Sequence, residues 1–349
     1  MVLAAIYATI RSMAGRKIGH VDREEWRWVA LAAVALVTVS SLPYLVGWAV
    51  TPDDAHFTAL MVNPLDGHSY VAKMRQGLAG AWRFRLVFTP EQQNGAYLFL
   101  LHLGLGHLAR LTGWSLVAVY HGARVIAGGW LLAVIYRFVA LLADDRRRRR
   151  QAWLLVSVSS GLGWLVAPLT GYLTSDLWVP EAFVFYSILD TLHFPLAIAL
   201  MLVTLGALAR PDREPGWGHA LVAAGASVGL GIVQPFGVIP VYGTLGVWWG
   251  LRWLRDRRVP WRAVGWSVVA GLVAVAYPLY GVMAIRADPV LAEWSAQNQT
   301  PSPPVWDWLL SFGLLTALAA PGVGVALRRR TDSDLLLLAW VIAAGVGMY

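Results

Sequence analysis

Runs of about twenty apolar residues recur along the whole chain, and they restrict what it can fold into more than any other feature. A helix of that length crosses the roughly 30 Å of hydrocarbon in a bilayer. Only 14% of the residues are charged and the mean hydropathy is +0.57, so charge is too sparse to cover the surface of a soluble domain. A transmembrane β-barrel would show short segments of alternating polarity instead. The sequence therefore predicts an all-α, polytopic membrane protein.

The basic residues gather in short clusters at the ends of the apolar runs. The net charge of +8 would suit nucleic acid, but this placement is the one that the positive-inside rule predicts for cytoplasmic loops. We therefore expect no nucleic-acid partner and place four clusters in the cytoplasm: 146–150, 210–213, 252–262 and 328–330. The sequence contains no cysteine, which excludes a disulfide framework and a cysteine-ligated metal site.

One assignment of spans puts each of these clusters inside the cell. It requires about nine transmembrane helices in a single membrane domain of residues 1–349. Residues 1–28 form a cytoplasmic leader before an uncleaved anchor, and residues 51–114 form an extracytoplasmic first loop. The chain stops inside an apolar run, which predicts a truncated C-terminus. The predicted spans are 29–50, 116–143, 152–169, 192–209, 219–233, 236–254, 263–283, 305–327 and 335–349.

Two apolar stretches allow more than one interpretation. Residues 96–111 are short and carry two histidines and an arginine, so we expect a juxtamembrane amphipathic helix on the outer surface rather than a span. If this stretch crossed the membrane, the arginines of 146–150 would lie outside the cell. The motif Gln234-Pro235-Phe236-Gly237 interrupts another apolar run and indicates either a tight outer turn or a broken helix.

The polar segment 53–113 is where we expect chemistry, because the rest of the chain is mostly apolar. Asp66 opens a helical pattern in which Tyr70 and Met74 share an apolar face while Lys73 falls elsewhere. One interpretation makes Asp66 a capping residue at the start of an interfacial helix that a tryptophan anchors. The other makes it a functional carboxylate.

The string Asp66…Tyr70…Met74…Gly80-Ala81-Trp82 resembles the first-loop signature of GT-C fold glycosyltransferases, such as the protein O-mannosyltransferases and the bacterial aminoarabinose transferases. The stretch 97–113 resembles the second juxtamembrane helix of that family, and His121-Gly122-Ala123-Arg124 resembles the arginine-bearing start of the next span. This likeness covers about residues 29–150. The chain departs from the family at Asn94-Gly95-Ala96, where a proline pair often stands, and this departure leaves the substrate open.

The resemblance implies an inverting transfer of a sugar from a polyprenyl-phosphate carrier to an acceptor glycan, lipid or protein. It implies Asp66 as the base, with Asp54 second and Asp53 third, because a carboxylate must take a proton from the acceptor. Arg124 is implied as a partner of the donor phosphate, unless it snorkels to the outer headgroups. The further candidates are Lys73 and Arg75 for the phosphate, and Tyr70, Trp82, Glu91, His193 and Gln234 for the pocket.

A second polar patch follows the third predicted span. It contains Glu181 and, further along, Asp190 and His193, which are three residues apart near a predicted membrane entrance. This spacing would place Asp190 and His193 on one face of a helix. They could face the active-site cavity or serve as interfacial caps.

No cofactor is predicted, because no two histidines have the spacing of a zinc protease site. Asp54, Asp66 and Glu91 could instead hold magnesium or manganese. The predicted partners are the polyprenyl-phosphate sugar and membrane lipid. The composition suggests a bacterial inner membrane, with the N-terminus cytoplasmic and the active site extracytoplasmic. The non-enzymatic alternatives are a transporter or flippase for a lipid or sugar, and an envelope-assembly subunit.

Overall fold

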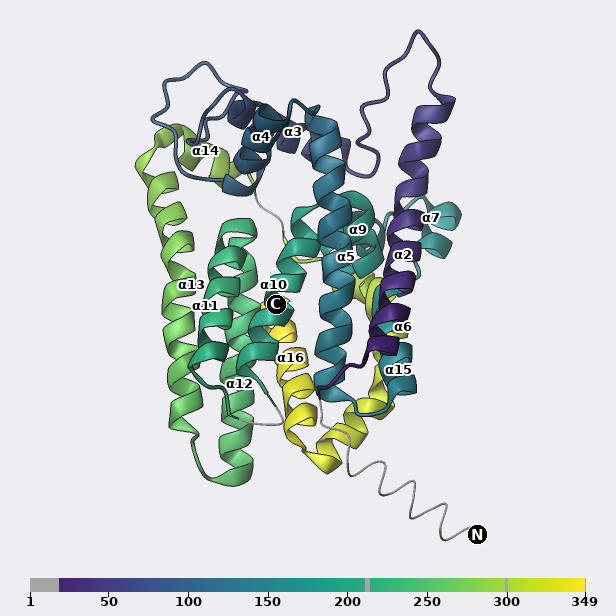
Figure 1. The fold of residues 1–349 in the computed structure, drawn as a ribbon, viewed down its shortest axis with the longest axis vertical. Coiled ribbons are helices and arrows are strands. Elements are labelled where there is room, and N and C mark those ends of the chain that lie inside the picture. Colours follow the sequence, from purple (N-terminus) through teal and green to yellow (C-terminus); the bar gives the residue numbers. More distant parts are fainter. Residues whose placement is uncertain (1–18, 211–213, 299–300, 349) are drawn as a thin grey trace.

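Helices make up nearly all the regular structure of this chain. The computed structural model describes residues 19–210, 214–298 and 301–348, and within these ranges the only β pairing is one isolated bridge between Phe84 and Ala96. Most helices run along the long axis of a bundle, and a smaller group lies across one end of it (Figure 1). The predicted all-α class is confirmed. Most of the predicted leader, residues 1–18, lies outside the described residues.

Several helices of the bundle could cross a bilayer. Five of them are long and apolar enough: α2 (Arg23–Val50), α5 (Leu116–Leu142), α6 (Arg146–Val158) together with α7 (Gly163–Thr170), α13 (Trp261–Ala287) and α15 (Val305–Arg329). The other bundle helices are shorter: α10 (His193–Leu208), α11 (Trp217–Val233), α12 (Val238–Asp256) and α16 (Asp332–Met348). Their lengths and composition fit a multi-pass membrane protein, while the count of nine crossings remains a prediction.

The outer end of the bundle, the end that carries residues 51–114, has a layer of short helices. They are α3 (Pro64–Leu78), α4 (Leu100–Thr112) and α14 (Pro289–Gln297) (Figure 1). The backbones of α3 and α4 touch because Gly77 and Gly106 place no side chain between them. A β-carbon at Gly77 would come within 2.0 Å of the Leu103 carbonyl oxygen, and one at Gly106 within 2.0 Å of the Met74 carbonyl oxygen. Most of the stretch 96–111 is therefore a helix of this layer.

Three short helices connect α7 to α10. They are α8 (Ser175–Trp178), the 3-10 helix η1 (Pro180–Ala182) and α9 (Val184–Asp190). Buried Asp307 of α15 accepts hydrogen bonds from the Ser175 amide at 3.0 Å and the Ser175 hydroxyl at 2.5 Å. Buried Asp176 accepts one from the Gly163 amide at 3.0 Å. Because a buried carboxylate is costly unless it is hydrogen-bonded, these contacts hold the segment firmly against α7 and α15.

The motif Gln234-Pro235-Phe236-Gly237 is a tight turn between two helices. Gln234 ends α11, and the 3-10 helix η2 (Pro235–Gly237) leads directly into α12. The Gly237 amide closes the turn on the Gln234 carbonyl oxygen at 2.9 Å, while Pro235 has no amide proton to continue α11. The broken-helix interpretation is therefore wrong.

The opposite end of the bundle, called the basic end below, contains the arginine cluster 146–150. Arg149 turns inward and pairs with Glu25 of α2 at 3.2 Å. The Tyr136 hydroxyl of α5 donates to the same carboxylate at 2.8 Å. All three side chains are buried, so this network ties α2, α5 and α6 together.

Candidate active site

Lys73 of α3 lies at the centre of a polar group at the outer end. Only 7% of its surface is exposed. Its ammonium donates to the Ser69 hydroxyl at 2.9 Å and lies 4.1 Å from the ring centroid of Phe99 and 5.1 Å from that of Tyr70. No carboxylate of the described residues is within ion-pair distance of it. Burial lowers the pKa of Lys73 to about 8, although nearby Asp66 acts in the opposite direction.

The burial of Lys73 differs from what the helical pattern indicated. The pattern placed Lys73 away from the apolar face that contains Met74, yet both side chains are buried. The reason is the close contact between α3 and α4, which covers a second side of α3. A hydrophobic pattern identifies the apolar face of a helix but not a polar face that a neighbouring helix covers.

Two histidines complete the group around Lys73. The rings of His102 from α4 and His193 from α10 each lie 4.9 Å from the ring of Tyr70 and 5.6 Å from each other. Both histidines are buried, and His102 Nε2 and His193 Nδ1 have no hydrogen-bond partner among the described residues. Burial, then the charges of His193 and Lys73, lowers the pKa of His102 well below its ordinary value. Buried polar atoms without partners are rare, which makes this group a candidate ligand site.

Three carboxylates are close enough to act electrostatically on the same group. Asp66, Asp190 and Glu181 all act electrostatically on the Tyr70 hydroxyl. Asp190 ends α9 and is buried, and its Oδ2 has no hydrogen-bond partner among the described residues. Burial raises the pKa of Asp190 to about 7, and repulsion from Asp66 and Glu181 adds to this effect, while Arg124 opposes it. Of these three carboxylates, Asp190 can therefore exchange a proton near neutral pH.

Glu181 and Asp66 are the accessible members of the cluster. Desolvation by the surrounding protein atoms raises the pKa of Glu181, and repulsion from Asp66 adds to this effect. The side chain of Glu181 nevertheless remains accessible to water. Asp66 lies in the first turn of α3, and its carboxylate accepts a hydrogen bond from the Asn63 side chain at 2.7 Å. Asn63 is at the cap position because Pro64, with its fixed φ, begins the helix. The interpretation that made Asp66 the capping residue is therefore wrong, and its role as a functional carboxylate stays a prediction.

Arg124 of α5 holds the backbone that leads to Asp190. Only 1% of its surface is exposed, so it does not snorkel to the headgroups. Its guanidinium donates to the Ile188 carbonyl oxygen at 2.6 Å, to the Ser41 hydroxyl at 3.0 Å and to His121 Nδ1 at 3.2 Å. In this arrangement Arg124 stabilises the carbonyl end of α9 and acts on the charge of Asp190.

Two residues with left-handed backbone lie beside this group. Ala59 has φ of 59° and Phe99 has φ of 54°, a region that non-glycine residues rarely adopt. The Ala59 carbonyl oxygen bonds to His121 Nε2 at 2.9 Å, and His121 in turn accepts from Arg124. The ring of Phe99 lies under the Lys73 ammonium. Such backbone strain persists only where surrounding contacts impose it, and it is concentrated at functional sites.

The structure brings together some of the residues proposed from the sequence and leaves others apart. Asp66, Lys73, Tyr70 and His193 belong to the group around Lys73. Arg124 adjoins it. Outside the group lie Asp53, Asp54, Arg75 and Glu91, which are exposed, Trp82, whose ring stacks on His107 at 4.1 Å, and Gln234, in its turn. No group of three or more His, Asp or Glu side chains in the described ranges could hold a metal ion.

Sequence reasoning did not identify His102 and Phe99 as members of this group. His102 was only one polar residue of an amphipathic stretch, and Phe99 had no distinguishing pattern. The spacing of Asp190 and His193 was a useful signal, although the two residues do not share a helix: α9 ends at Asp190 and α10 begins at His193. They meet the group from two helices rather than from one face.

The group can accept a proton on a carboxylate beside a buried ammonium and two imidazoles. This combination suits a reaction in which a hydroxyl loses a proton while an anionic group departs. Comparison of the chain with models of protein families, with curated proteins and with solved structures finds no match.

Proposed function

We propose that this chain is a membrane glycosyltransferase of the GT-C type, which moves a sugar from a polyprenyl-phosphate carrier to an acceptor. The observation that carries this proposal is the buried Lys73 with its two unpartnered histidines, next to three carboxylates at one end of an apolar helix bundle. A membrane-embedded donor with an anionic leaving group needs both kinds of residue at such an end.

The carboxylates accept the proton that the acceptor hydroxyl loses. In the proposed step the acceptor oxygen forms a bond to the anomeric carbon of the sugar, and the bond between that carbon and the phosphate oxygen breaks. Asp66 takes the acceptor proton because its side chain is accessible. Asp190, with its pKa raised to about 7, is the second residue able to hold a proton there.

Lys73 stabilises the negative charge of the departing phosphate. Negative charge develops on the phosphate as its bond to the sugar breaks, and an ammonium in a dry site stabilises that charge more than it would in water. His102 and His193 can donate hydrogen bonds from imidazole N–H groups to further phosphate oxygens. Arg124 is then a positioning residue that fixes the end of α9 and acts through Asp190.

The proposed topology has nine crossings: α2, α5, α6 with α7, α10, α11, α12, α13, α15 and α16. The arginine clusters at the basic end face the cytoplasm, as positive-inside bias requires, and the outer end faces the extracytoplasmic side of a bacterial inner membrane. The group around Lys73 then lies at the extracytoplasmic face, where the polyprenyl-phosphate donor and the acceptor are predicted to meet.

Sugar transfer in proteoliposomes tests this proposal. A panel of radiolabelled polyprenyl-phosphate sugars is supplied to the wild-type chain, to Asp66→Asn and to Asp54→Asn, the second candidate from the sequence. We expect Asp66→Asn to reduce transfer by about 10²- to 10⁴-fold, the usual loss for a proton-transfer group. Glu91→Gln, an exposed carboxylate of the same loop, is the matched control and should leave the rate unchanged. Movement of labelled lipid across the bilayer without transfer would instead identify a transporter.

A further inference from the structure

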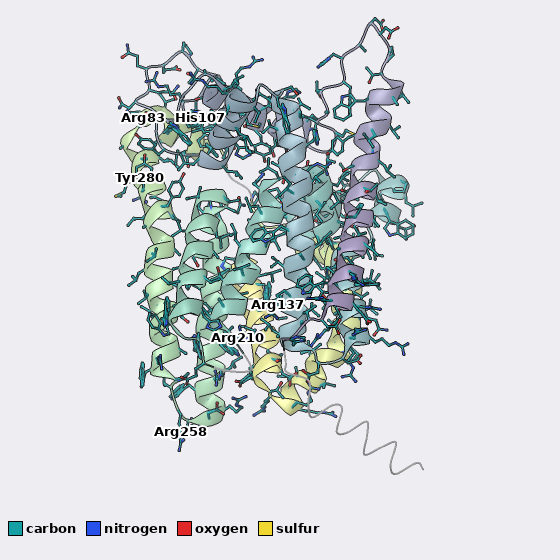
Figure 2. The ribbon with its side chains drawn as sticks, viewed as in Figure 1. Arg83, His107, Arg137, Arg210, Arg258 and Tyr280 are labelled. Atoms are coloured by element: carbon teal, nitrogen blue, oxygen red, sulfur yellow. The ribbon has the colours of Figure 1, made fainter. Side chains whose placement is uncertain are left out.

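A cavity of about 380 Å³ lies at the basic end between α5, α10 and α11. Its walls are mainly apolar, with Phe138 of α5 and Leu202 of α10 among them. Three basic side chains also line it: Arg137, Arg210 and His219. Figure 2 labels Arg137 and Arg210 in the lower part of the bundle, well separated from the outer end. The cavity is therefore distinct from the group around Lys73.

The basic side chains of this cavity are held in position by the protein. Arg210 and His219 share a hydrogen bond of 3.2 Å, which links the end of α10 to the start of α11. The Arg137 guanidinium of α5 donates to the Gly19 carbonyl oxygen. A guanidinium carries five N–H donors, so it can hold a carbonyl oxygen and a phosphate oxygen together. Two guanidinium groups, one from α5 and one from the segment just after α10, thus adjoin one apolar space.

We propose that this cavity binds an anionic membrane phospholipid, with an acyl chain against the apolar walls and the lipid phosphate on Arg137 and Arg210. A hydrocarbon chain covers such apolar walls favourably. Basic pockets between membrane helices at the cytoplasmic side recognise anionic lipid headgroups. A free phosphate or a soluble nucleotide would leave the apolar walls uncovered. This lipid site goes beyond the proposed sugar transfer and does not depend on it.

Lipid retention by the purified full-length chain tests the site. Native mass spectrometry compares diacyl phosphatidylglycerol with diacyl phosphatidylcholine, and glycerol phosphate serves as a headgroup without chains. We expect the wild type to retain phosphatidylglycerol preferentially, and glycerol phosphate not to displace it. Because one arginine near an anionic lipid changes affinity about fivefold, Arg210→Gln should weaken phosphatidylglycerol retention by about that factor. Arg258→Gln, at the same end but not lining the cavity, is the matched control (Figure 2).

Filling the cavity tests the acyl-chain part of the proposal. A β-carbon at Gly206 would lie 3.3 Å from Leu141 and 3.5 Å from Phe138, so Gly206→Leu occupies this space and should lower retention of both lipids. Gly225→Leu on exposed α11 surface is its control, since nothing lies within 4 Å of that β-carbon. Equal retention of the two lipids by the wild type, displacement by glycerol phosphate, or an equal effect of Arg258→Gln would overturn the proposal. The headgroup comparison needs only the wild-type chain and therefore survives misfolding of a variant.

Discussion

Arg149 at the basic end and Lys73 at the outer end are both buried cations, but their surroundings differ. At the basic end Arg149 donates to the Ala143 carbonyl oxygen at 2.7 Å and to the His20 carbonyl oxygen at 2.8 Å, and it pairs with Glu25. At the outer end Lys73 has one hydroxyl acceptor and two aromatic rings. A buried charge that the fold fully satisfies is part of the scaffold. A buried charge left incompletely satisfied, among unpartnered imidazoles, is available to a ligand.

The largest expected effect is the loss of the paired charge at the basic end. Glu25→Ala leaves Arg149 buried without its carboxylate, and breaking such a pair costs about 3–5 kcal/mol of stability. Thermal unfolding in detergent should show a large fall in Tm. The control is Glu24→Ala, which removes one of the two carboxylates that pair with Arg146 from an exposed position and should cost at most about 1 kcal/mol. Similar losses in both variants would mean that burial does not distinguish the two pairs.

The corresponding change at the outer end should affect activity rather than folding. Lys73→Met removes the ammonium while keeping a long side chain against Phe99. We expect sugar transfer to fall by about 10²- to 10³-fold, the loss seen when a preorganised group that stabilises developing charge is removed. The Tm should not decrease, because an incompletely satisfied buried charge is lost. A large drop in Tm with unchanged transfer would make Lys73 a scaffold residue like Arg149.

Sequence patterns predicted the helical class, the end-layer helix within 96–111 and the position of Asp66 near a helix start. They could not predict the burial of Lys73, because that depends on a second helix whose approach is set by Gly77 and Gly106. Hydropathy describes each segment by itself. The group around Lys73 depends instead on which distant segments of the chain meet. His102 belongs to it because α4 brings its ring close to His193 of α10, and no pattern within 96–111 indicates that contact.

The pH dependence of stability sharpens the comparison further. Burial lowers the pKa of Lys73 from the ordinary 10.5 to about 8, so between these values the unfolded chain binds a proton that the folded chain has released. Stability should therefore rise as pH increases across this window, while sugar transfer falls because the neutral amine no longer attracts phosphate. Thermal unfolding and transfer are measured at matched pH values. Lys73→Met should remove the rise in stability, and a wild-type Tm independent of pH would contradict the assignment.

The smallest expected effect concerns backbone strain. Each end has left-handed residues of both kinds, and we compare one from each: Gly19 at the basic end, with φ of 80°, and Ala59 at the outer end, with φ of 59°. An L-residue in this conformation costs about 1–2 kcal/mol of stability. Replacing it with glycine removes this cost, but the larger conformational entropy of glycine in the unfolded chain offsets part of the gain. Ala59→Gly should therefore stabilise the chain by up to about 1 kcal/mol. Gly19→Ala should destabilise it, since the added β-carbon would also lie 3.0 Å from Leu141.

The activity of these two variants separates strain that serves the site from strain that does not. Ala59 holds His121 through its carbonyl oxygen, and His121 bonds to Arg124, which fixes the end of α9 beside Asp190. If that rigidity positions Asp190, Ala59→Gly should raise the Tm yet lower sugar transfer, the trade-off expected where a strained element supports function. Gly19→Ala lies at the basic end and should lower the Tm without changing transfer per folded molecule. Unchanged transfer in Ala59→Gly would show that the backbone strain at Ala59 does not contribute to sugar transfer.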